Sequence, residues 1–273
     1  MERMILLTIL AFSVASQAAC TQKEDVPRPN TEVTSSTENK SWKLVWTDEF
    51  DGMSIDSQAW SPVSKNPGVD WCHYMAPNRK DLAYIDNGQL VLLGKVDGNT
   101  FVTGGVMSQG KKAFKCAKFE IRAKFNSIQG FWPAIWLMPD PWWVSWPDGG
   151  EIDIMEHINH ESKVSQTVHS KYTQNVSKSE PNHSKSASIN PAQWNTYAVE
   201  VYSDVIIMYV NGEKTLSYPK MSDKQDQYPF SDYPYYLILS NQLEGEWAGN
   251  VTNPSDLPSE LRIDWVKVYE FVP

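Results

Sequence analysis

Hydrophobic and polar positions alternate in short runs along residues 41–273, and turn residues separate these runs. A β-strand has this period, because successive side chains of a strand point to opposite faces. The clearest run spans 117–125, where apolar residues alternate with charged ones. No stretch of the chain carries a long apolar stripe at helical spacing, so we expect strands throughout.

Two Asn-Gly pairs, at 87–88 and 211–212, indicate β-hairpins, because this dipeptide tolerates the positive φ angles of a tight turn. We expect strands on both sides of these turns and in three further segments: 82–85, 89–93, 206–210, 213–216, 196–202, 235–240 and 261–269. Many short strands over some 230 residues favour two packed antiparallel sheets, a β-sandwich that forms one all-β domain.

The first 40 residues have a different pattern. Residues 1–19 read as a signal peptide, because a charged start precedes an apolar run that is too short to span a bilayer. The segment that ends at Cys20 resembles a bacterial lipobox, with Gln17 where a Leu is usual. Residues 20–40 are polar and predict a flexible tether, which leaves 41–273 as the folded domain. We therefore expect a lipid-anchored protein facing outward from a bacterial outer membrane, with plain secretion or a periplasmic location as the alternative.

The charge and the cysteines exclude several classes of function. Lys and Arg number 24 against 33 Asp and Glu, a net charge of -9, which argues against nucleic-acid binding. Besides Cys20, only Cys72 and Cys116 are present, and either a disulfide or two free thiols fits them. No Cys/His zinc spacing and no glycine-rich phosphate loop occurs, so we expect no organic cofactor. We expect a monomer.

Three carboxylates lie within six residues of an apolar strand at Glu151, Asp153 and Glu156. The first two share a face of a regular strand, while the third would fall on the opposite face. A β-bulge at Ile154-Met155 would bring Glu156 to the side of the other two, and bulges favour active sites. Three charges at this spacing repel one another, so the pKa of at least one carboxyl should be raised.

A pair of neighbouring carboxylates is the arrangement that retaining glycoside hydrolysis requires. One carboxylate attacks the anomeric carbon, and the other donates a proton to the leaving oxygen and then activates water. Scattered acids on an exposed edge strand, or a calcium site, are the alternatives. An edge strand would not need Ile at both intervening positions, and calcium ligands usually come from a loop.

The motif Glu151-Ile152-Asp153-Ile154-Met155-Glu156 resembles the bulged signature of glycoside hydrolase family sixteen, which includes laminarinases. Three further blocks are similar to that family in the same order: 46–52, 130–139 and 263–269. The resemblance implies a β-jelly-roll sandwich with a concave substrate cleft. It also implies Glu151 as nucleophile, Glu156 as acid/base and Asp153 as the assisting acid.

The resemblance further implies a structural calcium in many members of the family, away from the chemistry. The matching positions are Glu49, the backbone of Gly88 and Asp264. Such an ion would stabilise the sandwich and would take no part in the reaction.

Several aromatic and polar side chains are candidates for substrate binding. Trp132 and Trp136 share a strand face and would flank the acids, where a flat ring can stack on the C–H face of a sugar. His169 would donate to a sugar or adjust Glu156. Gln242 stands where the family commonly has Ala, and Trp247 is a further platform. Three tryptophans at 142, 143 and 146 would either wall the cleft or fold back on themselves.

The sequence thus predicts an endo-acting retaining hydrolase of a β-linked polysaccharide, with β-1,3-glucan or mixed-linkage β-1,3/1,4-glucan as the leading substrate. An endo-β-galactosidase acting on mucin O-glycans, keratan-type chains or a marine galactan is the first alternative. A non-catalytic carbohydrate-binding sandwich is the second. A lectin has no need of three closely packed carboxylates, so their presence argues against the binding role.

Overall fold

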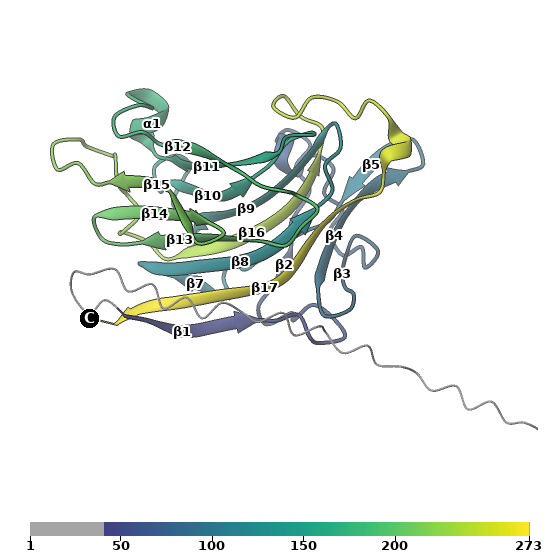
Figure 1. The fold of residues 1–273 in the computed structure, drawn as a ribbon, viewed down its shortest axis with the longest axis horizontal. Helices are drawn as coiled ribbons and strands as arrows, with labels where there is room; N and C mark the ends of the chain where they lie inside the picture. The colour runs from purple at the N-terminus through teal and green to yellow at the C-terminus, as the bar shows by residue number, and fades with distance from the viewer. Residues whose placement is uncertain (1–40, 273) are drawn as a thin grey trace, which may run out of the picture. The chain divides into compact units, whose positions relative to one another are not determined.

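A computed structural model describes residues 41–272, and the predicted signal peptide, tether and Cys20 lie outside this part. Within it, the strands form two antiparallel sheets, one of nine strands and one of eight (Figure 1). This is the all-β sandwich that the alternating pattern predicts. Helical structure in the described part is limited to α1 (Lys171–Asn175) and two single 3₁₀ turns, η1 (Asp70–Cys72) and η2 (Pro254–Asp256).

The nine-stranded sheet has the order β15-β14-β13-β8-β17-β4-β3, with β1 added beside β17 and β5 beside β4. Its strands are β1 (Ser41–Asp48), β3 (Ala83–Ile85), β4 (Leu90–Asp97), β5 (Thr100–Thr103), β8 (Ala117–Phe125), β13 (Asn195–Val201), β14 (Val205–Val210), β15 (Glu213–Pro219) and β17 (Ser259–Val272). Both Asn-Gly pairs connect paired strands as predicted, because β3 pairs with β4 and β14 with β15. In each Asn the φ angle is positive.

The eight-stranded sheet has the order β12-β11-β10-β9-β16-β6-β2, with β7 added beside β16. Its strands are β2 (Ser61–Pro62), β6 (Gly105–Met107), β7 (Ala113–Phe114), β9 (Phe131–Pro139), β10 (Glu151–Glu156), β11 (Lys163–His169), β12 (Ser184–Ser188) and β16 (Tyr235–Leu243). The acid motif thus forms a central strand of this sheet, β10, between β9 and β11.

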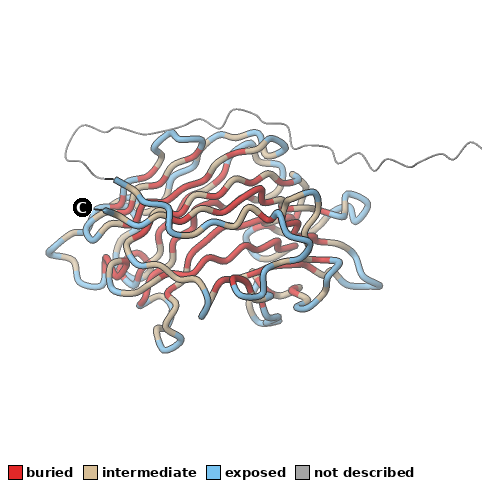
Figure 2. Tube along the Cα trace, turned by 90° about the horizontal axis from the view of Figure 1, so that it is seen from below, coloured by how far each residue is buried: buried red, intermediate tan, exposed pale blue. Residues whose placement is uncertain are grey.

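The main core fills the space between the two sheets, and Figure 2 shows burial concentrated along the strands. In β8, buried and half-buried residues alternate without exception, so its apolar side faces the core and its charged side faces outward. From β9 and β10, residues such as Ile135, Leu137 and Ile152 point into the core and are fully buried. Their neighbours along each strand therefore point to the other face of the eight-stranded sheet, which we call the outer face.

Both remaining cysteines are free thiols, Cys72 buried and Cys116 half-buried. The structure therefore favours the second of the two alternatives that the sequence allowed. Among residues 41–272, no helix has the length and apolar character needed to cross a membrane.

Candidate active site

The strand that carries the acids is irregular at the expected point. Against β9, Asp153 pairs with Trp136 and Glu156 with Ala134, and the register shifts between Asp153 and Met155. Three residue steps on β10 thus correspond to two on β9, which is the signature of a bulge. Since Trp136 and Ala134 share a face, Asp153 and Glu156 share one too. Ile154 and Met155 are fully buried on the core side.

The three carboxylates are close enough to perturb one another on the outer face. Glu151 and Asp153 are joined by a side-chain hydrogen bond, and both acids act electrostatically on Glu156. Burial, followed by the charge of Asp153, raises the pKa of Glu151 to about 8. Burial also raises the pKa of Asp153, to about 7. For Glu156, burial and then the charges of Asp153 and Glu151 raise the pKa well above its ordinary value.

The two glutamates have different neighbours. Burial and the charges of Asp153 and Glu151 favour the protonated form of Glu156, while the Trp132 hydrogen bond and His169 act in the opposite direction. Glu151 receives a hydrogen bond from Trp146 and feels the nearby His169, and both lower its pKa. A protonated acid beside an ionisable carboxylate on one surface is the arrangement that double displacement at a sugar requires.

Two tryptophans on the outer face form one side of the site. Trp132 Nε1 donates to Glu156 Oε1 at 3.1 Å, a contact that sequence reasoning did not predict. The ring of Trp247 meets Trp132 edge to face, with centroids 5.3 Å apart, and Trp247 is 44% exposed. These two rings therefore lie beside the acid/base candidate with surface available to a ligand. Trp142, Trp143 and Trp146 are exposed in the loop before β10.

Trp136 lies on the expected face but is only 6% exposed. Its Nε1 donates to Ser240 Oγ at 3.2 Å, and Trp71 packs edge-on against its ring at 4.7 Å between centroids. The expectation that Trp136 stacks on a sugar therefore does not fit this arrangement, because another part of the chain covers the ring. Trp71 stands in no alternating run, and no sequence signal placed it here.

His169 contacts a different acid from the one expected. Its Nε2 lies 3.2 Å from Asp153 Oδ2, and the two residues come from the paired strands β11 and β10. On the other side of the ring, Gln174 Nε2 lies 2.7 Å from Nδ1. Gln174 belongs to α1, which Ser170 and Thr173 cap reciprocally. His169 therefore lies against Asp153, although no hydrogen bond to Asp153 Oδ2 forms, and it acts on Glu156 only electrostatically.

Gln242 is paired with Trp132 across β16 and β9, so it faces the outer side as predicted. It is 1% exposed, its Nε2 donates to the Leu243 carbonyl, and its Oε1 has no hydrogen-bond partner. A buried amide oxygen without a partner is costly. Gln242 thus lies on the predicted face next to Trp132, but its side chain is covered even more fully than Trp136, so a direct contact with a sugar does not fit this arrangement.

Glu151, Asp153 and His169 form the one group of metal-binding residue types found close together within residues 41–272, with candidate ligand atoms within 4.8 Å. All three belong to the hydrogen-bonded acid site. A metal held there would occupy the carboxylate oxygens that the proposed chemistry needs.

The calcium positions do not fit an ion as the side chains lie. The Asp264 carboxylate pairs with Arg122 Nη1 at 2.5 Å, and Glu49 Oε1 lies 3.5 Å from Lys267 Nζ. A calcium ion needs six to eight oxygen ligands, and it would have to displace these basic side chains. We therefore derive no role for calcium.

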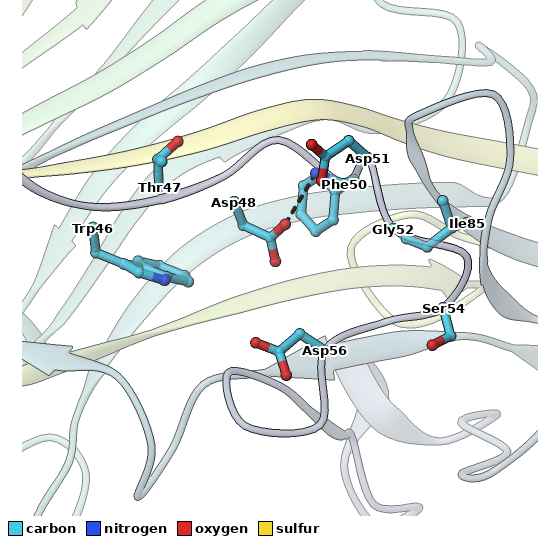
Figure 3. Close-up of a pocket in the computed structure, with 9 residues that line it drawn as sticks. All are labelled: Trp46, Thr47, Asp48, Phe50, Asp51, Gly52, Ser54, Asp56 and Ile85. Carbon is cyan, nitrogen blue, oxygen red and sulfur yellow. Dashed lines mark hydrogen bonds between the residues drawn. The ribbon is translucent and has the colours of Figure 1, made fainter.

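A hollow of about 220 Å³ after β1 is drawn in Figure 3. It is lined by Trp46, Thr47, Asp48, Phe50, Asp51, Gly52, Ser54, Asp56 and Ile85, and none of the three acids of β10 is among them. Both carboxylate oxygens of Asp48 accept hydrogen bonds, from the Phe50 amide at 2.9 Å and from Trp60 Nε1 at 2.8 Å. These hydrogen bonds order the turn after β1 that lines the hollow. The hollow is separate from the candidate active site.

Comparison with known proteins agrees with the geometry. The chain is 37% identical over 238 residues to a keratan-sulfate endo-1,4-β-galactosidase of Sphingobacterium multivorum, covering 84% of the chain and 55% of that relative. It therefore spans about half of that relative's length. It is 30% identical over 247 residues to a β-glucanase of Rhodothermus marinus, covering 85% of the chain and 86% of the relative.

Solved structures give the same fold. The laminarinase from Rhodothermus marinus superposes with a TM-score of 0.75 at 28% identity, over 86% of this chain and all of that chain. A structure from work on endo-acting O-glycanases, which human gut bacteria express to initiate mucin breakdown, has a TM-score of 0.75 at 31% identity. It covers 83% of this chain and 98% of that chain. The family model of glycosyl hydrolases family 16 matches residues 73–267. The chain therefore belongs to glycosyl hydrolases family 16.

Proposed function

We propose that the protein is a retaining, endo-acting hydrolase that cleaves internal β-linkages of a polysaccharide. The observation that carries this proposal is the bulge in β10, which places Glu156 on the same face as Glu151 and Asp153. Glu151 would attack the anomeric carbon while Glu156 protonates the leaving oxygen. Glu156 would then take a proton from the water that releases the sugar from Glu151.

Asp153 and His169 support the nucleophile in this scheme. Asp153 is 2% exposed and lies between the Glu151 carboxyl and the His169 ring. Its hydrogen bond with Glu151 raises the pKa of Glu151 and lowers that of Asp153, so the two carboxyls titrate as a pair, and Glu151 must give up the shared proton before it attacks. His169 Nε2 lies 3.2 Å from Asp153 Oδ2, and Gln174 holds the other side of the His169 ring.

The substrate class that we propose is a β-galactosyl glycan of the keratan or mucin O-glycan type. The relative at 37% identity supports it, as does the O-glycanase structure. A β-1,3- or mixed-linkage glucan is the second candidate, supported by the β-glucanase and laminarinase of Rhodothermus marinus.

Digestion of four polymers tests both candidates. Purified residues 41–273 would be incubated with keratan sulfate, mucin, laminarin and barley β-glucan, and the products separated by anion-exchange chromatography. We expect oligosaccharides from keratan sulfate or mucin, released with the β-configuration in an early NMR spectrum. Products from the glucans alone would shift the assignment to the second candidate. The Glu151→Gln variant serves as control, and activity that survives in it would refute the nucleophile assignment.

For the location of the protein, we propose attachment to the bacterial envelope through a lipid on Cys20. The lipobox-like sequence and the polar segment 20–40 support this, and both lie outside the described residues. Cell fractionation of the full chain and its Cys20→Ala variant tests it. We expect the variant to leave the membrane fraction, and unchanged retention would contradict a lipid anchor.

A further inference from the structure

The outer face of the eight-stranded sheet carries a second apolar cluster that the main core does not include. Ala134 and Trp136 of β9 and Tyr236 and Ile238 of β16 belong to it, and each is at most 7% exposed. In β16 all nine residues are buried, although every second side chain points away from the core. Because a single sheet covers only one face of a strand, another part of the chain must cover β16 on its outer face.

The cover is the segment that includes η1, which we call the cover segment and define as residues 63–75. Its apolar members pack on this cluster: Val63, Val69, Trp71, Cys72 and Met75. A side chain at Gly105 of β6 would begin 3.0 Å from the Met75 sulfur and methyl carbon, so the glycine permits this close approach. Trp71 meets the Trp136 ring at 4.7 Å and 83°, an edge-to-face contact that fixes its orientation.

Two polar contacts tie the cover segment to the loop that carries Trp247. Asp70 Oδ2 accepts the backbone N–H of Glu246 at 2.7 Å, and Tyr74 Oη donates to Glu244 Oε2 at 3.0 Å. Since Trp247 packs on Trp132, the cover segment, the loop and the tryptophan pair form one continuous wall. This wall ends at Glu156, the acceptor of the Trp132 indole.

The wall stands very close to the acids on one side only. Trp136, which Trp71 covers, is the direct cross-strand partner of Asp153, so the wall begins about 5 Å from the catalytic strand. On the opposite side, burial falls away across β11 and β12. His169 and Ser165 are half-buried, and Ser186 and Ser188 of β12, which continue their face, are exposed. The outer face is thus more exposed over β12 and the ends of β11 than over β16, where all nine residues are buried.

We propose that Trp71 forms an end wall of the substrate cleft, which limits how many sugar units bind on the β16 side of the scissile bond. This inference rests on the proposed function, because it concerns the binding of a β-linked glycan chain at the same acids. The more exposed side over β11 and β12 takes the longer part of the chain. The wall makes Trp71 a specificity-determining residue that contacts the last sugar on its side.

Binding measurements test the wall without hydrolysis. In the Glu151→Gln background, calorimetry would compare Trp71 with Trp71→Ala on keratan-type and β-1,3-glucan oligosaccharides of increasing length. We expect affinity with Trp71 to reach a plateau at a short length. Trp71→Ala should move this plateau to a longer oligosaccharide. The affinity for that longer oligosaccharide should rise by about fivefold, the size expected when one more sugar ring contacts the protein.

Two further variants keep the result interpretable. Trp71→Leu retains apolar cover over Trp136 with a shorter side chain, so it should fold and move the plateau in the same direction. Trp194→Ala removes a half-buried tryptophan near the nine-stranded sheet, where it packs under Arg122 and Lys124, and should leave the plateau unchanged. The same plateau in both folded Trp71 variants, or no binding of any oligosaccharide, overturns the end wall. Hydrolysis by the wild type is scored separately, so the proposed function can fail or stand independently.

Discussion

The contact between Trp132 and Glu156 predicts how the activity depends on pH. The indole N–H donates to Glu156 Oε1 at 3.1 Å in a buried site, and this hydrogen bond lowers the pKa of a carboxyl that burial otherwise raises. Trp132→Phe keeps a flat aromatic ring on the same strand position but removes the donor. The ionised form of Glu156 then loses more stabilisation than the protonated form, so the pKa of Glu156 should rise.

The size of the shift follows from the energies of the two hydrogen bonds. A hydrogen bond to a charged group contributes about 1.5–3 kcal/mol, and one to a neutral group about 0.5–1.5 kcal/mol. The difference of about 1–1.5 kcal/mol corresponds to roughly one pKa unit. Since Glu156 must be protonated to donate to the leaving oxygen, the basic limb of the kcat/KM profile should move up by about one pH unit.

The assay is kcat/KM against pH for the wild type, Trp132→Phe and Trp247→Phe. Trp247 touches the Trp132 ring, and no hydrogen bond from it to a carboxylate is seen within residues 41–272, so its variant should change KM alone. A uniform loss of kcat/KM in Trp132→Phe, with the basic limb in its original place, would refute the reasoning. Trp132 would then act only through its contact with the sugar.

Three further predictions concern stability. Glu156→Gln should raise the free energy of unfolding at neutral pH, because the neutral amide avoids the cost of keeping Glu156 protonated in the folded state. The raised pKa of Glu156 costs stability only above the ordinary value of 4.5, so thermal melts should show the gain shrinking to nothing as pH falls through 4.5. Gly104→Ala should cost about 1–3 kcal/mol or more in urea unfolding, because its Cβ would lie 2.0 Å from the Leu82 carbonyl oxygen. Gly52→Ala, whose Cβ makes only ordinary contacts from 3.5 Å, is its control. EDTA should leave the melting temperature unchanged, since Asp264 and Glu49 pair with Arg122 and Lys267; a clear drop would point to a bound calcium.

The strands and the spacing of the three acids could be predicted from the sequence, because both depend on residues that are close together in the chain. The alternation in 117–125 predicts β8, and the Asn-Gly pairs predict two hairpins, since each follows from the backbone preferences of neighbouring residues. The spacing of Glu151, Asp153 and Glu156 on an apolar strand predicts a bulge, because without one the core would have to admit a charge.

Side-chain partners that come from distant segments needed the tertiary structure. Nothing near His169 in the sequence indicates that it lies against Asp153 and not against Glu156. Likewise, Arg122 and Lys267 reach the two carboxylates expected to bind calcium only because β8 and β17 are paired and the chain turns after β1.

By itself, the sequence determined a sandwich of short strands and a row of three acids on one of them, because these properties depend on residues a few positions apart. Only the tertiary structure decided which parts of the outer face stay open to a ligand. Trp136 has the same alternating pattern as Trp132, yet one is covered and the other is half-exposed. The difference comes from residues 63–75, which have no strand periodicity and pack on β16 only once β6, β9 and β16 have come together. Burial by a distant segment depends on the completed fold, and no local pattern records it.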